Sequence, residues 1–339
     1  MKRAYVYPYS GRNTSLIPNP YINHFMEAAK PWFHIVNDQK PSYTGIFDLL
    51  KYLFRLDVVF LNWIEDLPDK KYGVLQSFVF LFSLVMMKVL SVQVVWTLHN
   101  KGTHGSIHPK MKSRLYGWMI RHADLIITHA SEGREYLKQQ IGKDDHKILF
   151  AHHPVICDSQ GNNTTKAHPT IDLFIWGTLE RYKKVDEFLR FAVEKGYNQK
   201  YSLYVHGKIR DPQYRDLLIE FNRYPNVEVQ DGYIAFERLY EMMNRTRLTA
   251  FTYSHSSVLS SGALMDSLCG ASAIIGPHKG AFADLQKQGL IFTFNRFQDI
   301  FSVLETLDSE TLKDLGRKKR AFFKQNTWKG FAQKVYQSL

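Results

Sequence analysis

A serine- and glycine-rich start to an apolar helix is the part of this sequence best suited to phosphate chemistry. Ser260, Ser261 and Gly262 stand directly before an apolar run that contains Leu264 and Met265. At a helix N-terminus the backbone N–H groups are unpaired and the helix dipole is positive, so such a start binds phosphate without a metal ion. The same residue types are favoured as ordinary helix caps. The interpretation therefore depends on the rest of the chain.

The composition indicates a globular protein with an anionic partner. The chain has 339 residues, 45% of them hydrophobic and 22% charged, and a formal net charge of +12. This length predicts two domains, and the charge favours nucleotide phosphates, a membrane surface or nucleic acid. No nucleic-acid-binding motif accompanies the charge, so nucleic acid is not an expected partner. Cys157 and Cys269 lie far apart and indicate neither a disulfide framework nor a zinc site.

Two segments bear on the location of the protein. The N-terminus leads straight into a predicted strand without the apolar core of a signal peptide, which indicates a cytoplasmic protein. Residues 73–90 are apolar, but polar side chains interrupt them. A span needs roughly 20 apolar residues, so this segment predicts a buried helix or a helix that lies against a bilayer.

Short apolar runs alternate with helical patterns, which is typical of βαβ units and parallel sheets. In the first half the predicted strands are 4–7, 33–35, 58–61, 92–97 and 125–128, and the predicted helices are 18–29, 45–55, 73–90, 110–122 and 131–141. In the second half the predicted strands are 172–176, 202–206, 227–230, 249–252 and 273–275, and the predicted helices are 185–195, 212–221, 236–245, 262–268, 311–323 and 327–339. A polar stretch without periodicity separates the halves and predicts a linker.

These elements predict an α/β protein with two Rossmann-like, doubly wound domains that face a cleft. The expected boundaries are a first domain at 1–156, a linker at 157–169, a second domain at 170–325 and a helix at 326–339 that crosses back to the first domain. Ligands of such sheets bind at the carboxyl ends of the strands. The sequence contains no GxGxxG, no GxxxxGK[ST] and no Asp-x-Asp, which weakens dinucleotide, P-loop and divalent-metal interpretations.

An ordered series of motifs resembles the retaining glycosyltransferases of family 4 and its relatives, which have the two-domain fold called GT-B. The motifs are DVVFLNW at 57–63, VVWTLHN at 94–100 followed by His104, ADLIITHAS at 123–131, IWGTLERYKK at 175–184, YVHGK at 204–208 and NVEVQDGYI at 226–234. The resemblance implies transfer of a hexose from a nucleotide-diphosphate sugar, with retention of configuration and with no cofactor or metal. It assigns acceptor binding to the first domain and nucleotide-sugar binding to the second.

The resemblance also implies a set of donor-binding residues. The donor pyrophosphate is expected at the basic loop and the helix start, which contain Thr178, Arg181, Lys183, Lys184, Ser260, Ser261 and Gly262. Thr178 replaces an arginine of the family, and Arg181 or Lys184 would supply the second charge beside Lys183. The nucleotide and ribose are expected at His206, Gly207, Tyr233 and Met265. A solvated turn is the alternative for the basic loop.

Two family glutamates are missing. Their positions hold Ser257 and Met265, and a methionine thioether accepts hydrogen bonds only weakly. Asp266 is adjacent but should point about 100° away on a helix. Some relatives carry a Ser-Gly pair here instead of a glutamate. Either nucleotide binding uses Ser260, Ser261 and backbone groups, or catalysis has been lost.

Catalytic and acceptor residues are expected in the first domain. His99 ends a buried strand, and the equivalent histidine of the family touches a hydroxyl of the donor sugar; Asn100 and His104 share its loop. An inverting relative would need a general base, for which His99 or His104 would serve. Asn19 and Tyr21 resemble an acceptor-side loop. A histidine bonded to backbone and an asparagine helix cap are the simpler alternatives.

The expected acceptor is a lipid-linked saccharide or an oligosaccharide, in the assembly of a surface polysaccharide. The basic charge and the apolar segment at 73–90 fit peripheral attachment to the cytoplasmic face of a membrane. Loops 252–259 and 279–284 are expected to set specificity. Two alternatives stay open: a nucleotide-sugar 2-epimerase, and a non-catalytic partner subunit with a GT-B fold.

Overall fold

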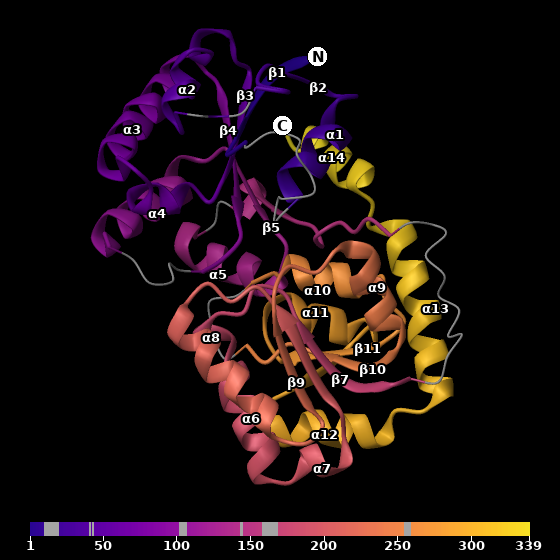
Figure 1. Cartoon of the computed structure of the whole chain (residues 1–339). Coiled ribbons are helices and arrows are strands. Elements are labelled where there is room, and N and C mark those ends of the chain that lie inside the picture. The colour runs from indigo at the N-terminus through magenta and orange to yellow at the C-terminus, as the bar shows by residue number, and fades with distance from the viewer. Residues whose placement is uncertain are drawn as a thin grey trace. The chain divides into compact units, whose positions relative to one another are not determined.

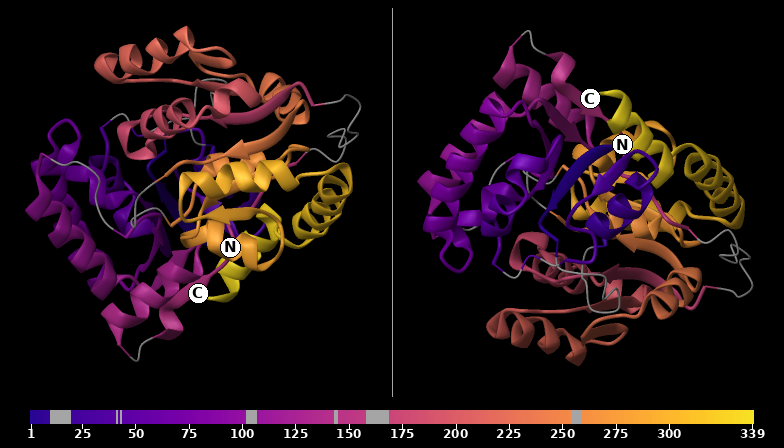
Figure 2. Two further views of the ribbon diagram at one scale, coloured as in Figure 1. Left: turned by 90° about the horizontal axis from the view of Figure 1, so that it is seen from below. Right: turned by 90° about the horizontal axis from the view of Figure 1, so that it is seen from above.

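The chain forms two compact α/β units, each built on a six-stranded parallel sheet (Figures 1 and 2). The computed structural model describes residues 1–9, 20–40, 42, 44–101, 107–142, 145–157, 169–253 and 259–339. The first unit contains Met1–Pro154, Ser257–Ser260 and Asn326–Leu339, and the second contains Val155–Ser256 and Ser261–Gln325. Two doubly wound α/β units were expected from the sequence, and the two sheets confirm this fold class.

The first sheet has the strand order β2-β1-β3-β4-β5-β6. Its strands are β1 (Lys2–Tyr7), β2 (Phe33–Ile35), β3 (Val58–Asn62), β4 (Gln93–Leu98), β5 (Leu125–Thr128) and β6 (Ile148–Phe150). The helices of this unit are α1 (Tyr21–Ala29), α2 (Phe47–Leu50), η2 (Leu53–Arg55), η3 (Ile64–Asp69), α3 (Gly73–Val89), α4 (Pro109–His122), α5 (Ser131–Ile141), η4 (Asp145–Lys147) and α14 (Trp328–Gln337). Strands β3 and β5 are buried along their whole length because helices cover both faces of the sheet. The sequence did not predict β6.

The last helix belongs to the first unit. The chain returns there at Asn326, and α14 packs on α1 through aromatic rings. The ring centroids of Trp328 and Tyr21 are 5.1 Å apart, and those of Phe331 and Phe25 are 6.0 Å apart. No described helix is both long enough and apolar enough to cross a bilayer.

The second sheet has the strand order β12-β11-β10-β7-β8-β9. Its strands are β7 (Ile171–Trp176), β8 (Leu203–Gly207), β9 (Val227–Asp231), β10 (Thr246–Ala250), β11 (Ala273–Pro277) and β12 (Phe292–Phe294). The helices of this unit are η5 (Arg181–Lys183), α6 (Val185–Glu194), α7 (Tyr197–Lys200), α8 (Pro212–Ile219), η6 (Glu220–Arg223), α9 (Phe236–Asn244), α10 (Gly262–Ser267), α11 (Gly280–Lys287), α12 (Phe297–Thr306) and α13 (Ser309–Gln325).

Two sequence-based expectations for the second unit are wrong. Residues 279–284 were expected to form a specificity loop, but α11 begins at Gly280, and Ala281, Phe282 and Leu285 are buried on its inner face. Strand β10 begins at Thr246, three residues before the predicted start, because polar residues on a central strand are tolerated where they are hydrogen-bonded. Thr246 Oγ1 donates to the Met242 carbonyl at 2.8 Å, and Thr249 Oγ1 bonds Ser272 Oγ at 2.7 Å.

The second unit also contains a disulfide, which the sequence did not indicate. Cys157 and Cys269 form a disulfide across 112 residues of sequence, with their Cα atoms 5.5 Å apart. Cys157 stands near the start of the second unit, and Cys269 follows α10 in the same unit. Spacing could not reveal this pair, because only the folding of the second unit brings the two cysteines together.

Removing the disulfide with Cys157→Ser and Cys269→Ser is expected to destabilise the second unit by about 3 kcal/mol. A bridge that closes a loop of this size restricts the unfolded chain, and measured losses are typically about 2–4 kcal/mol. Urea unfolding with and without a reductant measures the loss. Equal stability of the oxidised wild type and the double variant would show that the bridge does not constrain the unfolded chain.

Candidate functional site

The carboxyl ends of β7, β8, β9 and β10 meet at one edge of the second sheet, which is the ligand-binding edge in folds of this kind. Gly177 follows β7 with φ +109°, a backbone conformation that favours glycine. A side chain on Gly207, at the end of β8, would collide with the Gly177 carbonyl oxygen. The two glycines therefore let the first two loops of this edge approach each other closely.

Lys183 lies at this edge in η5, and its buried ammonium group lacks a negatively charged partner among the described residues. It is 7% exposed, and burial lowers the pKa of its ammonium group. The Lys183 Nζ lies 5.2 Å from the centre of the Tyr253 ring and 3.6 Å from the place where a side chain on Gly177 would begin. It forms no ion pair with any described residue. A buried charge without a counter-ion is unfavourable, so an anion at this position would stabilise it.

Tyr253 joins the basic loop to the start of α10. Its ring lies against Lys183, and its hydroxyl bonds Ser261 Oγ at 3.3 Å. Ser261 in turn caps α10 by accepting from the Leu264 N–H at 3.4 Å. Thr252 Oγ1 donates to the Lys183 carbonyl at 2.6 Å, which holds η5 beside β10. The lysine and the helix start that the sequence singled out are therefore brought together by one tyrosine.

The other members of the basic loop have partners of their own. Arg181 Nε donates to Asp211 Oδ2 at 2.8 Å, and its guanidinium lies 5.1 Å from the centre of the Tyr214 ring. Lys184 pairs with Glu187 at 3.0 Å. Thr178 is half-buried directly after Gly177. Of the three cations in this loop, Lys183 alone is both buried and without an ion pair to a described residue.

The residues expected to bind the nucleotide lie along the same edge, at the ends of β8 and β9. His206 is the second-last residue of β8, and its Nδ1 is buried without a hydrogen-bond partner among the described residues. Burial and the nearby Arg238 lower the pKa of His206. Tyr233 follows β9 and is 70% exposed, so its ring presents a free face. An unpaired imidazole and an exposed ring are the features that a planar base can use for hydrogen bonding and stacking.

Helix α10 carries Asp266, which the sequence did not place among the donor-binding residues. Met265 is 2% exposed and faces the interior. Ala263 and Ser267 face β7: Ala263 Cβ lies 3.8 Å from the start of a side chain on Gly177, and Ser267 Oγ accepts from Trp176 Nε1 at 2.8 Å. Asp266 stands three residues after Ala263 and therefore shares this face. Burial raises the pKa of Asp266 to about 7.

In the first unit, His99 follows β4 and contacts Asn62, the last residue of the neighbouring strand β3, and Trp63 directly after it. Asn62 Nδ2 donates to the Tyr7 carbonyl at 3.3 Å, so its Oδ1 accepts from His99 Nε2 at 3.1 Å. The Trp63 ring stacks on the imidazole with centroids 4.2 Å apart. Burial lowers the pKa of His99 to about 3. The imidazole is therefore neutral, and Nδ1 is its acceptor nitrogen.

The Tyr21 ring lies edge-on to the His99 imidazole, with centroids 5.2 Å apart. It belongs to a group of packed rings, which we call the histidine cluster: Tyr21, Trp63, His99, His129, His153 and Trp328. His129 Nδ1 donates to the Ala151 carbonyl at 2.8 Å, so its Nε2 accepts from the Tyr21 hydroxyl at 2.8 Å. Burial keeps the pKa of His129 well below its usual value and lowers that of His153 to about 4. Three neutral imidazoles thus pack around one buried tyrosine.

Some sequence-based candidates stay without a structural description. Asn19, His104 and Ser257 lie outside the described residues. Asn100 accepts from the Tyr116 hydroxyl at 3.4 Å through its backbone carbonyl. Ser260 belongs to the first unit, and its hydroxyl is buried without a hydrogen-bond partner in the described part of the chain. Gly262 is the first residue of α10.

Tyr253, Asp266, His129 and His153 are candidate functional residues that the sequence did not identify. His129 follows a strand as His99 does, so its position after β5 was the available signal. Tyr253 carried no such signal, because its role depends on the register of β10. Among the described residues, no group of three or more His, Cys, Asp or Glu side chains is arranged to hold a metal ion.

The fold matches solved glycosyltransferase structures over the whole chain. HepE from Anabaena in complex with UDP-glucose has a TM-score of 0.69 and 11% identity, with all of both chains covered. A glycosyltransferase from Rickettsia africae ESF-5 has a TM-score of 0.65 and 11% identity over 99% of this chain and 97% of that one. An alpha-glucosyltransferase in complex with UDP-glucose and DNA has a TM-score of 0.61 and 13% identity over 98% of each.

These likenesses establish the fold. No protein-family model and no curated protein sequence matches the chain. At 11–13% identity the solved structures show that the chain has the two-domain GT-B fold that the motifs implied.

Proposed function

We propose that this protein is a glycosyltransferase that moves a hexose from a nucleoside diphosphate sugar to an acceptor hydroxyl. The observation that carries the proposal is the buried Lys183 ammonium, which has no ion pair with a described residue at the ligand-binding edge of a GT-B fold. A uridine diphosphate sugar is the proposed donor, because HepE and the alpha-glucosyltransferase were solved with UDP-glucose.

The proposed reaction breaks the bond between the sugar C1 and the diphosphate oxygen and forms a bond between C1 and the acceptor oxygen. The acceptor proton leaves with the diphosphate or to solvent. Negative charge grows on the departing diphosphate, and preorganised donors at that position lower the barrier. Lys183 supplies a full positive charge, while Ser261 and the N–H groups at the start of α10 supply hydrogen bonds. This donor set is proposed to work without a metal ion.

The nucleoside is proposed to lie toward His206, Tyr233 and Asp266. His206 offers a buried nitrogen without a described partner, and Tyr233 offers an exposed ring. Burial raises the pKa of Asp266 to about 7, so the group is only partly ionised at neutral pH. Ribose hydroxyls that donate to it would favour the carboxylate, which can accept from two of them. In this proposal Asp266 substitutes for the family glutamate that Met265 replaces.

His99 is proposed to accept a hydrogen bond from a sugar hydroxyl through Nδ1. A group with a pKa near 3 is a weak base at neutral pH, so His99 is poorly suited to deprotonate an acceptor. This supports retention rather than an inverting mechanism that uses His99 as general base. The buried Tyr21 ring packs against the imidazoles of His99, His129 and His153.

The acceptor is proposed to be a lipid-linked saccharide or an oligosaccharide, in polysaccharide assembly at the cytoplasmic face of a membrane. Exposed apolar side chains on α3 and the net charge of +12 support a membrane contact. The Cys157–Cys269 disulfide does not support a cytoplasmic location, because disulfides are uncommon in that reducing environment.

The first test is a thermal-shift panel of UDP, UDP-glucose, GDP, ADP and CMP without metal. A ligand at about 100 times its dissociation constant stabilises the folded state by about 2.7 kcal/mol. For a unit of this size that raises the melting temperature by about 5–10 °C. Uridine, which lacks phosphates, should produce a much smaller shift. A flat panel with well-folded protein would favour the non-catalytic partner subunit.

A further inference from the structure

Helix α3 exposes an apolar face along its whole length. The side chains at 75, 78, 82, 85 and 89 follow the spacing of three and four residues that places them on one face. We call this face the α3 stripe: Leu75, Phe78, Phe82, Val85 and Val89, which are 51–72% exposed. The opposite face carries Phe80, Leu84 and Met87 into the core of the first unit. A helix that packs on a sheet normally has a polar outer face, so the apolar outer face of α3 indicates a contact with an apolar partner.

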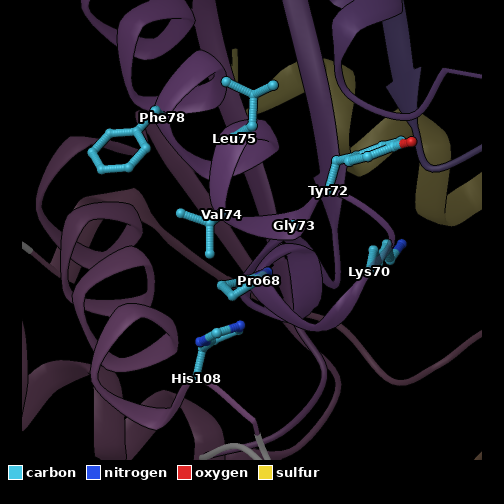
Figure 3. Close-up of a pocket in the computed structure, with 8 residues that line it drawn as sticks. All are labelled: Pro68, Lys70, Tyr72, Gly73, Val74, Leu75, Phe78 and His108. Carbon is cyan, nitrogen blue, oxygen red and sulfur yellow. The ribbon is translucent and has the colours of Figure 1, made fainter.

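A cavity of about 530 Å³ opens at the N-terminal end of the stripe (Figure 3). Leu75 and Phe78 belong to both the cavity and the stripe, and Val74 continues the apolar wall. Lys70 and His108 add basic groups to the lining. Figure 3 shows Val74, Pro68 and His108 close together at the base of α3. The cavity therefore combines an apolar wall with a basic edge, which suits an amphiphile that has an apolar chain and an anionic head group.

Positive charge stands at both ends of the stripe. Lys70 and Lys71 lie in the turn before α3, are exposed and form no ion pair with a described residue. At the other end, Lys88, Arg121 and Lys147 lie close enough to His122 to lower its pKa, in addition to the effect of burial. Near α3, Asp48 pairs with Lys51 and Asp124 pairs with Lys88, while Asp66 and Asp69 share Lys112, which leaves one negative charge over. Glu65 is buried, and burial raises its pKa to about 7. Lys70, Lys71, Arg121 and Lys147 form no ion pair with a described residue and outnumber that one charge, so the net charge around the stripe is positive.

We propose that the α3 stripe is a docking surface for an anionic phospholipid bilayer. The helix would lie in the membrane plane, with the stripe at the boundary between head groups and acyl chains and the cations among the phosphates. A second copy of the chain fits this face poorly, because a twofold contact would bring the basic ends together. The inference deepens the proposed function by giving its lipid-linked acceptor a surface, and it uses none of the donor-binding residues.

Flotation of the full chain with lipid vesicles tests the docking surface. The vesicles contain phosphatidylcholine, with or without 30% phosphatidylglycerol, at low and at high salt. We expect the wild type to bind the anionic vesicles and the double variant Phe78→Gln/Phe82→Gln to lose at least tenfold in partitioning. Lys70→Gln/Lys71→Gln should weaken binding to anionic vesicles at low salt. Ile219→Gln, which changes an exposed apolar residue on α8, is the matched control and should bind as the wild type does.

Three results would overturn the docking surface: a wild type that ignores anionic vesicles, equal binding by the phenylalanine variant, or a solution dimer that the same variant makes monomeric. Each variant is also melted with and without UDP. Lost vesicle binding with an intact UDP shift in the variant supports the docking surface. A wild type that binds vesicles but shows no UDP shift contradicts the proposed donor and leaves the docking surface standing.

Discussion

Replacing Lys183 with methionine is expected to lower the rate of donor turnover by about 10²- to 10³-fold while the protein stays folded. Loss of one preorganised group that stabilises developing negative charge typically removes about 2.7–4 kcal/mol from transition-state binding. Methionine has nearly the length of lysine and fills the same buried space, so the substitution removes the charge without leaving a cavity. Hydrolysis of a UDP-sugar, measured as release of UDP, gives the rate without knowledge of the acceptor.

The stability of the ligand-free variant distinguishes a binding lysine from a structural one. Burial already lowers the pKa of Lys183, which means that the folded state disfavours its charge. Removing that charge should therefore leave the melting temperature unchanged or raise it, while the shift produced by UDP disappears. Lys195→Met is the control, since Lys195 is exposed at the end of α6. A lower melting temperature combined with an undiminished UDP shift would show that Lys183 holds the fold together instead.

The alternation of apolar runs and helical patterns was sufficient to predict five of the six strands in each parallel sheet. Strands such as β5 are buried on both faces and read as continuous apolar runs, so their positions are visible in the sequence. Strand β10 was placed too late because its first residues, Thr246 and Arg247, are polar. Arg247 Nη1 pairs with Asp172 at 3.0 Å, and such a partner comes only with the tertiary structure.

The candidate site was predictable where it depends on one loop and was missed where it depends on two. Lys183 follows a strand and a glycine, so its position at the sheet edge could be predicted. Its contact with Tyr253 joins loops about 70 residues apart and requires the order of β7 and β10 in the sheet. Asp266 was set aside because its neighbour held the family position, but the direction of α10 decides which of the two residues faces β7.

Acidification from pH 6.5 to pH 5 is expected to lower the free energy of unfolding of the first unit by about 3 kcal/mol. Burial holds the pKa of His99 near 3, that of His153 near 4 and that of His129 well below its usual value. Unfolded histidines bind protons below about pH 6.5, whereas these three folded ones do not, so each favours unfolding by up to about 1.4 kcal/mol per pH unit. Above pH 6.5 both states are neutral and the effect vanishes.

One buried carboxyl group in the same unit acts in the opposite direction. Burial raises the pKa of Glu65 to about 7, so between pH 7 and about 4.5 the folded state binds a proton that the unfolded state does not. Acid therefore stabilises the unit through Glu65, which offsets about one of the three histidines. The expected net loss of about 3 kcal/mol includes this opposing contribution.

The variant His153→Gln isolates the histidine contribution, because Glu65 titrates equally in the variant and the wild type. Urea unfolding at pH 7, 6 and 5 can be followed by tryptophan fluorescence, since five of the six tryptophans lie in the first unit. The difference in unfolding free energy between the two proteins should change by about 1.4 kcal/mol per pH unit below pH 6 and stay constant above pH 7. His34→Gln, at an exposed position on β2, should follow the wild type. Parallel pH profiles for all three proteins would mean that His153 becomes protonated in the folded state, and the histidine cluster would then not be the neutral group that positions His99.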